Sequence, residues 1–117
     1  MNNPEIMNTL YGQYANELGN VLEELDPEFA DIIREFPYEN IWNREGLTLK
    51  EKSICTISSL ISMGREDQTE IHMRGFLNSG GTVKELKELI IHLAVYSGFP
   101  SSLNAFKILN KVMKKND

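Results

Sequence analysis

Apolar residues recur at intervals of three and four along most of the chain, which is the spacing of amphipathic helices. The first stripe spans residues 4–25 and comprises Ile6, Leu10, Tyr14, Leu18, Val21, Leu22 and Leu25. Gly12 and Gly19 weaken this pattern only slightly, so we expect one helix here. Asp26 followed by Pro27 is typical of a second helix start, with a side-chain cap and proline in the first turn.

The second predicted helix is short and leads into an irregular connection. Its apolar residues are Phe29, Ile32, Ile33 and Phe36. Pro37 is expected to end this helix, because proline lacks an N–H and disfavours helical geometry in the preceding residue. Residues 38–47 show no period, and they predict an aromatic loop.

Boundary signals predict further helices in the second half of the chain. Thr48 with Glu51, and Thr82 with Glu85, are capping boxes in which each side chain can satisfy the backbone N–H of the other residue. The predicted helices run from 48 to about 64, from about 67 to 78, from 82 to 97, and onward from the turn at 98–100. No segment alternates with period two long enough for a strand. The pattern therefore predicts an all-α fold of about six helices, a single helical-bundle domain over residues 1–117.

Composition narrows the class of protein. Twelve basic and 17 acidic residues give a net charge of -5, which argues against a nucleic-acid partner. The single cysteine, Cys55, cannot form an internal disulfide and fits a reducing compartment. The N-terminus has no signal-peptide pattern, and no apolar run approaches the roughly 20 residues of a membrane helix. We therefore expect a cytoplasmic protein with no membrane partner.

Several segments, taken in order, resemble one known family. They are residues 42–48 (WNREGLT), 68–80 (QTEIHMRGFLNSG), 85–88 (ELKE), 94–100 (AVYSGFP) and 104–106 (NAF). Their order and spacing are similar to those of the carboxymuconolactone decarboxylase family, within the alkylhydroperoxidase D-like superfamily. The resemblance implies a helical bundle that assembles as a homotrimer or homohexamer. It also implies a lyase that decarboxylates a small carboxylated lactone or related ring acid, as in the catabolism of aromatic compounds.

The redox branch of this superfamily carries a Cys-x-x-Cys pair, and this chain lacks it. Arg65 and Gln68 stand at the two cysteine positions. Disulfide exchange needs a thiolate attacker and a resolving thiol, which neither residue supplies. An alkylhydroperoxidase or peroxiredoxin-like antioxidant activity is therefore the disfavoured alternative. A non-enzymatic oligomeric binding module is a third possibility.

His72 is the candidate catalytic residue, because an imidazole can give or take a proton near neutral pH. Gln68 lies four residues earlier and so shares a helix face with it, where its amide would orient a substrate. The alternative is a buried histidine hydrogen-bonded to a neighbouring helix, because Met73 and Phe76 lie on the same stripe.

Arg44 and Arg74 are the candidate anion-binding residues. The family's lactone substrate is a dicarboxylate, and arginine binds carboxylates with a two-pronged fork. A structural salt bridge is the alternative for each arginine.

Trp42 and Tyr96 are candidate pocket residues, with core or interface packing as the alternative. The partner expected is a small acidic molecule. No metal or cofactor is expected, since two histidines twenty residues apart with one cysteine lack zinc spacing and no nucleotide-binding motif occurs.

Overall fold

The computed structural model describes residues 1–115, and every regular element within them is a helix. The all-α prediction is therefore confirmed. Contacts between residues divide the chain into two compact units, Met1–Leu49 and Lys50–Asp117. The single domain over residues 1–117 stays a prediction.

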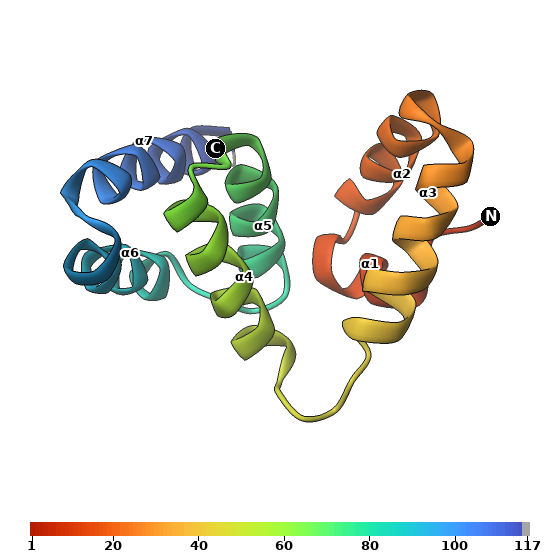
Figure 1. Cartoon of the computed structure of the whole chain (residues 1–117), viewed down its shortest axis with the longest axis horizontal. Coiled ribbons are helices and arrows are strands. Elements are labelled where there is room, and N and C mark those ends of the chain that lie inside the picture. Colours follow the sequence, from red (N-terminus) through yellow and green to blue (C-terminus); the bar gives the residue numbers. More distant parts are fainter. Residues whose placement is uncertain (116–117) are drawn as a thin grey trace. The chain divides into compact units, whose positions relative to one another are not determined.

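The first unit begins with two helices where the sequence predicted one. Its elements are α1 (Glu5–Tyr11), α2 (Tyr14–Leu25), α3 (Pro27–Ile33) and the π-helix η1 (Arg34–Ile41), shown in Figure 1. The prediction of one helix over residues 4–25 was wrong. Gly12 adopts a positive φ of 60° and donates its N–H to the carbonyl of Asn8 at 2.8 Å. This left-handed residue ends α1, because glycine adopts such geometry without a Cβ clash.

Pro37 lies inside a helix and does not end one. The N–H of Trp42 donates to the Pro37 carbonyl at 2.8 Å, five residues back, as in a π-helix. The wider π turn accommodates a proline that an α-helix would exclude from its interior. Residues 38–41, predicted as part of a loop, therefore belong to η1.

Arg34 is buried in the first unit, together with Met7, Leu10 and Tyr11 of α1. It is 3% exposed and pairs with the carboxylates of Glu23 and Asp31. Three of the four residues of the predicted apolar stripe are exposed instead, at 52% for Phe29, 58% for Ile32 and 62% for Phe36, and the fourth, Ile33, is half-buried. A buried guanidinium is stable only when it is paired in this way.

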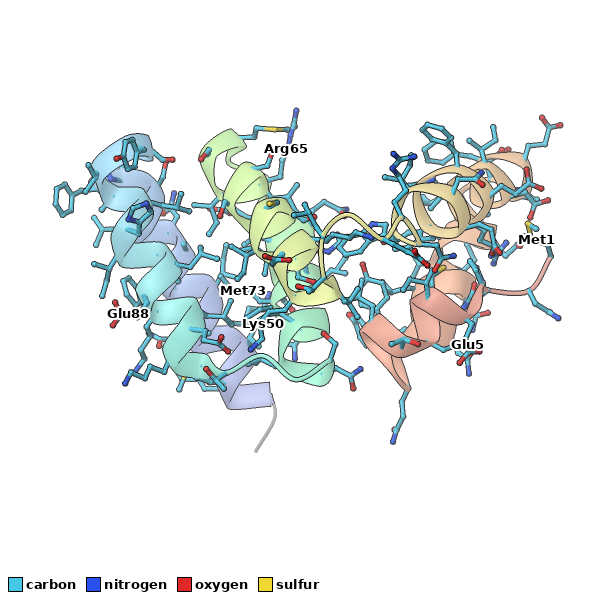
Figure 2. The ribbon with its side chains drawn as sticks, turned by 90° about the horizontal axis from the view of Figure 1, so that it is seen from below. Met1, Glu5, Lys50, Arg65, Met73 and Glu88 are labelled. Atoms are coloured by element: carbon cyan, nitrogen blue, oxygen red, sulfur yellow. The ribbon has the colours of Figure 1, made fainter. Side chains whose placement is uncertain are left out.

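The second unit is built from four helices around one hydrophobic cluster. They are α4 (Leu49–Met63), α5 (Glu66–Asn78), α6 (Val83–Ser97) and α7 (Phe99–Lys115). The buried members of the cluster are Ile57, Ile61, Met73, Phe76, Leu86, Ile90, Ala105, Leu109 and Val112. Figure 2 shows Met73 among the side chains that lie between these helices.

The predicted helix boundaries in this unit are close to the observed ones. Gly64 and Gly80 follow α4 and α5 with positive φ angles of 72° and 109°. The capping box before α6 is present, because Glu85 N–H donates to Thr82 Oγ1 and Thr82 N–H donates to the Glu85 carboxylate. The turn predicted at residues 98–100 is shorter than expected, since α7 already begins at Phe99.

Replacement of Gly81 by a larger residue is expected to destabilise the fold, because the Phe76 ring occupies the space beside it. A Cβ at Gly81 would lie 2.3–2.5 Å from three ring atoms of Phe76, which is 1% exposed. Gly81→Ala should therefore lower the free energy of unfolding by about 1–3 kcal/mol, measured by urea denaturation. Gly46→Ala is the matched control, since a Cβ there meets nothing within 4 Å. Equal losses in the two variants would contradict the expectation.

Candidate active site

His72 lies on the buried stripe of α5. The residue is 9% exposed, and Thr69, Met73 and Phe76 on the same helix are buried with it. Burial lowers the pKa of His72 from 6.5 to about 4, because a charged imidazolium loses its hydration there. The ring is consequently a neutral imidazole at pH 7, with one nitrogen that donates a hydrogen bond and one that accepts.

A neutral imidazole has a defined chemical capability. Its N–H can stabilise a developing enolate oxygen without being charged beforehand. It becomes a proton donor when an anion binds beside it, because a nearby negative charge raises the pKa of the ring. Both capabilities match what a decarboxylation requires after CO2 departs.

Gln68 is not enclosed with His72. It lies one turn earlier on α5, near the helix start, and its side chain is exposed to solvent. The spacing of four residues correctly placed both side chains on neighbouring positions of the helix surface. The spacing does not indicate how deeply either side chain is buried, and the role of Gln68 in orienting a substrate stays a prediction.

Arg74 is held by an ion pair within its own helix. Its guanidinium donates to Glu70 Oε2 at 3.2 Å and 3.3 Å, and both side chains are largely buried. Glu70 also pairs with Lys111 of α7 at 3.0 Å. Partial burial raises the pKa of Glu70, but the hydrogen bonds from Lys111 and Arg74 outweigh it and hold the pKa below its usual value. The salt bridge named as the alternative for Arg74 is present, and the role of Arg74 in binding an anion stays a prediction.

Trp42 and Arg44 belong to the first unit. Trp42 stacks on Tyr38 with ring centroids 6.2 Å apart and an interplanar angle of 11°. Tyr38 in turn shares a hydrogen bond of 2.7 Å with the Tyr11 hydroxyl. Burial raises the pKa of both tyrosines, so the pair remains protonated. The stacking is the packing named as the alternative for Trp42, whose role in a pocket stays a prediction. Arg44 lies exposed in the loop after η1.

Tyr96 projects from α6 into solvent. It is 77% exposed, and its ring lies 5.4 Å from the ring of His92, which is also exposed. Tyr96 therefore stays a predicted pocket residue, with packing at an interface as the alternative.

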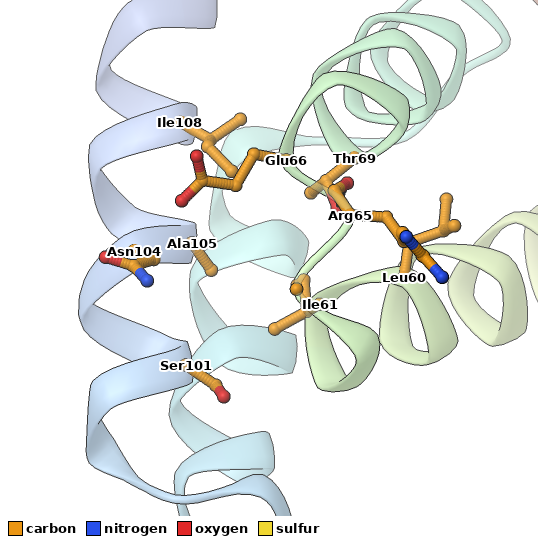
Figure 3. A pocket seen from close by; sticks show the side chains of 10 residues that line it. Leu60, Ile61, Arg65, Glu66, Thr69, Ser101, Asn104, Ala105 and Ile108 are labelled. Carbon is orange, nitrogen blue, oxygen red and sulfur yellow. Dashed lines mark hydrogen bonds between the residues drawn. The ribbon is translucent and has the colours of Figure 1, made fainter.

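Described residues of the second unit line two cavities that bear on the site. The one in Figure 3 holds about 40 Å³ where the end of α4 and the start of α5 meet α7. Ile61, Thr69 and Asn104 are among the residues of its wall. The second, between α4 and α6, holds about 450 Å³, and its wall includes Leu89 and His92. His72 is in neither wall, so the hollow expected beside His72 stays a prediction.

Sequence reasoning missed a buried polar residue on α4. Ser53 is 1% exposed and occupies the same phase as Ile57 and Ile61, four and eight residues later. That phase was a usable signal, because a serine on the apolar face of a helix is placed in the interior by its neighbours.

Comparison with known proteins decides the family. The model of the carboxymuconolactone decarboxylase family matches residues 27–111. The chain belongs to this family. The matched range runs from α3 into α7 and contains His72.

Two of the family's relatives are decarboxylases by name. The chain is 34% identical to 4-carboxymuconolactone decarboxylase of Acinetobacter baylyi over 111 residues, or 94% of this chain and 83% of that protein. It is 32% identical to nitrosuccinic acid decarboxylase of Metarhizium robertsii over 83 residues, or 71% of this chain and 58% of that protein. It is also 29% identical over 98 residues to an uncharacterised 15.0 kDa protein of Paracoccus denitrificans, covering 82% and 73% of the two chains.

The remaining features that bear on function are the cysteine, possible metal-binding groups and possible membrane helices. Cys55 is a free, exposed thiol on α4. Among the described residues, no group of three or more His, Cys, Asp or Glu side chains is arranged to hold a metal ion. Within the same residues, no helix combines the length and apolarity needed to cross a membrane.

Proposed function

We propose that this protein decarboxylates a small carboxylic acid of the carboxymuconolactone type, with His72 as the group that stabilises and protonates the product of C–C cleavage. The observation that carries the proposal is 34% identity with a 4-carboxymuconolactone decarboxylase over 94% of the chain. The buried, neutral imidazole on α5 supplies the chemistry.

The reaction breaks the bond between the ring carbon and the carboxylate carbon. CO2 leaves as a neutral molecule, and the electron pair passes into the conjugated lactone carbonyl to give a dienolate. The N–H of neutral His72 would donate a hydrogen bond to the dienolate oxygen, where negative charge develops. A proton delivered to carbon completes the reaction. His72 can deliver it once the bound anion has raised the pKa of the ring and the ring has taken up a proton from solvent. Transfer of that proton to carbon returns the ring to its neutral form.

Recognition of the substrate's other carboxylate is assigned to Arg44 or Arg74 as a proposal. Arg74 is already neutralised by Glu70, so a substrate that reached it would compete with a carboxylate one turn away. Arg44 is exposed in a loop, a position where binding residues are common. Gln68, Trp42 and Tyr96 stay in the proposal as residues that would orient or enclose the acid.

The direct test is an assay of the full-length protein with 4-carboxymuconolactone and, separately, nitrosuccinate. Release of CO2 together with loss of the lactone's ultraviolet absorbance would support the lyase. The absence of CO2 release from both acids and from related ring acids, with folded protein, would overturn the proposal. Peroxide consumption that depends on Cys55 would instead favour the redox alternative.

Self-association is also part of the proposal. The corner between α6 and α7 carries an exposed apolar patch made of Ile91, Val95, Tyr96, Phe99 and Leu103, each at least 54% exposed. Soluble monomers rarely leave contiguous apolar patches above a few hundred Å². A second copy of the chain is the occupant we propose, in keeping with the assembly that the family resemblance implies.

Val95→Asp is expected to shift the protein from an oligomer to a smaller species in sedimentation velocity. The reason is that a charge in the middle of the apolar patch would be desolvated by assembly. Lys87→Ala is the matched control, since it changes the net charge by the same one unit at an exposed position of α6. A monomeric wild-type protein, or an unchanged Val95→Asp variant, would refute this part of the proposal.

A further inference from the structure

Among the described residues of the second unit, four with polar side chains are buried, and one of them is unusual. They are Ser53, Thr69, His72 and Ser102. Thr69 donates to the Arg65 carbonyl at 2.8 Å, and Ser102 donates to the Ile90 carbonyl at 2.9 Å. Ser53 Oγ has no hydrogen-bond partner among the described residues. A buried hydroxyl without a partner is costly to a fold and calls for a functional reason.

The Ser53 hydroxyl also differs from three other hydroxyls of this unit that are satisfied by local backbone. Thr56, Thr69 and Ser79 each donate to the carbonyl four residues earlier, at 2.8–2.9 Å. That internal bond is the ordinary way for serine or threonine to be satisfied within a helix. Ser53 does not make it, although Leu49 lies four residues before. Its donor is therefore available to another acceptor.

Ser53 lies on the face of α4 that points to the same interior as the buried face of α5. Ile57, one turn after Ser53, packs in one cluster with Met73 and Phe76 of α5. The chain reverses at Gly64 and Arg65, so α5 returns in the opposite direction (Figure 1). His72, the neighbour of Met73 in sequence, is buried on the same side of α5. Ser53 is one helical turn before Ile57 on α4, a rise of about 5–6 Å.

We propose that Ser53 binds the substrate, donating a hydrogen bond from Oγ to the carboxylate of the small acid held beside the His72 imidazole. This inference rests on the proposed function. The carboxylate in question is the one that leaves as CO2. A cation beside this carboxylate would stabilise the charged substrate and so oppose the departure of CO2. Catalysis requires stronger binding of the transition state than of the substrate. A neutral hydroxyl orients this carboxylate with a smaller penalty, because its hydrogen bond stabilises the charged substrate less than a cation would.

Ser53→Ala separates a binding role from a packing role. It is expected to lower kcat/KM for 4-carboxymuconolactone about tenfold or more, the usual effect of losing a hydrogen bond to a charged group. Its thermal midpoint should be unchanged or higher, because an unpaired hydroxyl leaves the interior. Ser102→Ala is the control and should do the opposite, lowering the midpoint with kcat/KM unchanged. An unchanged kcat/KM in Ser53→Ala would overturn the inference. So would a result in which Ser53→Ala and Ser102→Ala lower the thermal midpoint and kcat/KM alike.

A binding measurement distinguishes failure of this inference from failure of the proposed function. Malonate, a small dicarboxylate, would be titrated into wild-type protein and Ser53→Ala while the ring resonances of His72 are followed by NMR. Binding that is about tenfold weaker in Ser53→Ala supports Ser53 even where no acid is decarboxylated, which would sink the lyase alone. Equal affinities in the two proteins, or no perturbation of His72 in the wild type, would overturn the role of Ser53.

Discussion

Replacing His72 by alanine is expected to lower the turnover number for decarboxylation by about 10²- to 10⁴-fold. The ring is a buried titratable group of α5. In the proposed mechanism its removal eliminates both the hydrogen bond to the dienolate and the proton that completes the reaction. The measurement is the rate of CO2 release at saturating acid, since the loss should appear in kcat and not only in KM.

Two further variants define how His72 acts. His72→Asn retains an N–H donor but cannot transfer a proton, so a turnover number between those of the wild type and His72→Ala would assign part of the effect to hydrogen bonding. His92→Ala is the control for loss of a histidine, because His92 is exposed on α6. A folded His72→Ala protein with wild-type turnover would remove His72 from the mechanism.

Acidification between pH 6.5 and about 4 is expected to destabilise the fold by up to about 3 kcal/mol through His72 alone. Burial holds the pKa of His72 near 4, whereas the unfolded chain titrates near 6.5. In this interval the unfolded state binds a proton that the folded state does not. The contribution is therefore fully present above pH 6.5 and is lost as the pH falls toward the folded pKa.

Urea denaturation at several pH values would measure this dependence. Carboxylates such as Glu70, whose folded pKa is also lowered, add a loss of the same sign at the acidic end of the range. The comparison with His72→Asn isolates the histidine, because asparagine does not titrate. Parallel curves for the wild type and His72→Asn would show that the imidazole is not kept neutral by burial.

The helix boundaries were predictable where a local chemical device sets them. Thr82 and Glu85 cap α6 as their spacing requires, and Gly64 and Gly80 end their helices. Gly12 and Pro37 were misjudged for opposite reasons. A glycine within an apolar stripe can continue a helix or end it, and only its φ angle decides. A proline ends an α-helix, but a wider turn admits it, and a sequence pattern does not distinguish the two.

Burial was less predictable than helix boundaries. Periodicity assigns large apolar residues to the interior, yet Arg34 is buried while Phe29 is exposed. The reason is a set of ion pairs to Arg34 from residues up to 11 positions away, which no local pattern records. His72 was correctly placed on an apolar stripe, with a buried position named as the alternative. Its pKa required the three-dimensional surroundings, because desolvation depends on every neighbouring element.

The π-helical turn at η1 also affects how the sequences of relatives should be aligned with this one. Each residue of a helix fixes the direction of those that follow, and a π turn contains one residue more than an α turn. A relative lacking one residue between Arg34 and Ile41 would close a regular α-helix and rotate every later side chain. The Tyr11–Tyr38 hydrogen bond and the stacking of Trp42 on Tyr38 would then lose their partners. A one-residue gap between residues 34 and 41 of an alignment therefore indicates that the aromatic residues around Tyr38 pack differently in that relative, even where the neighbouring residues are identical.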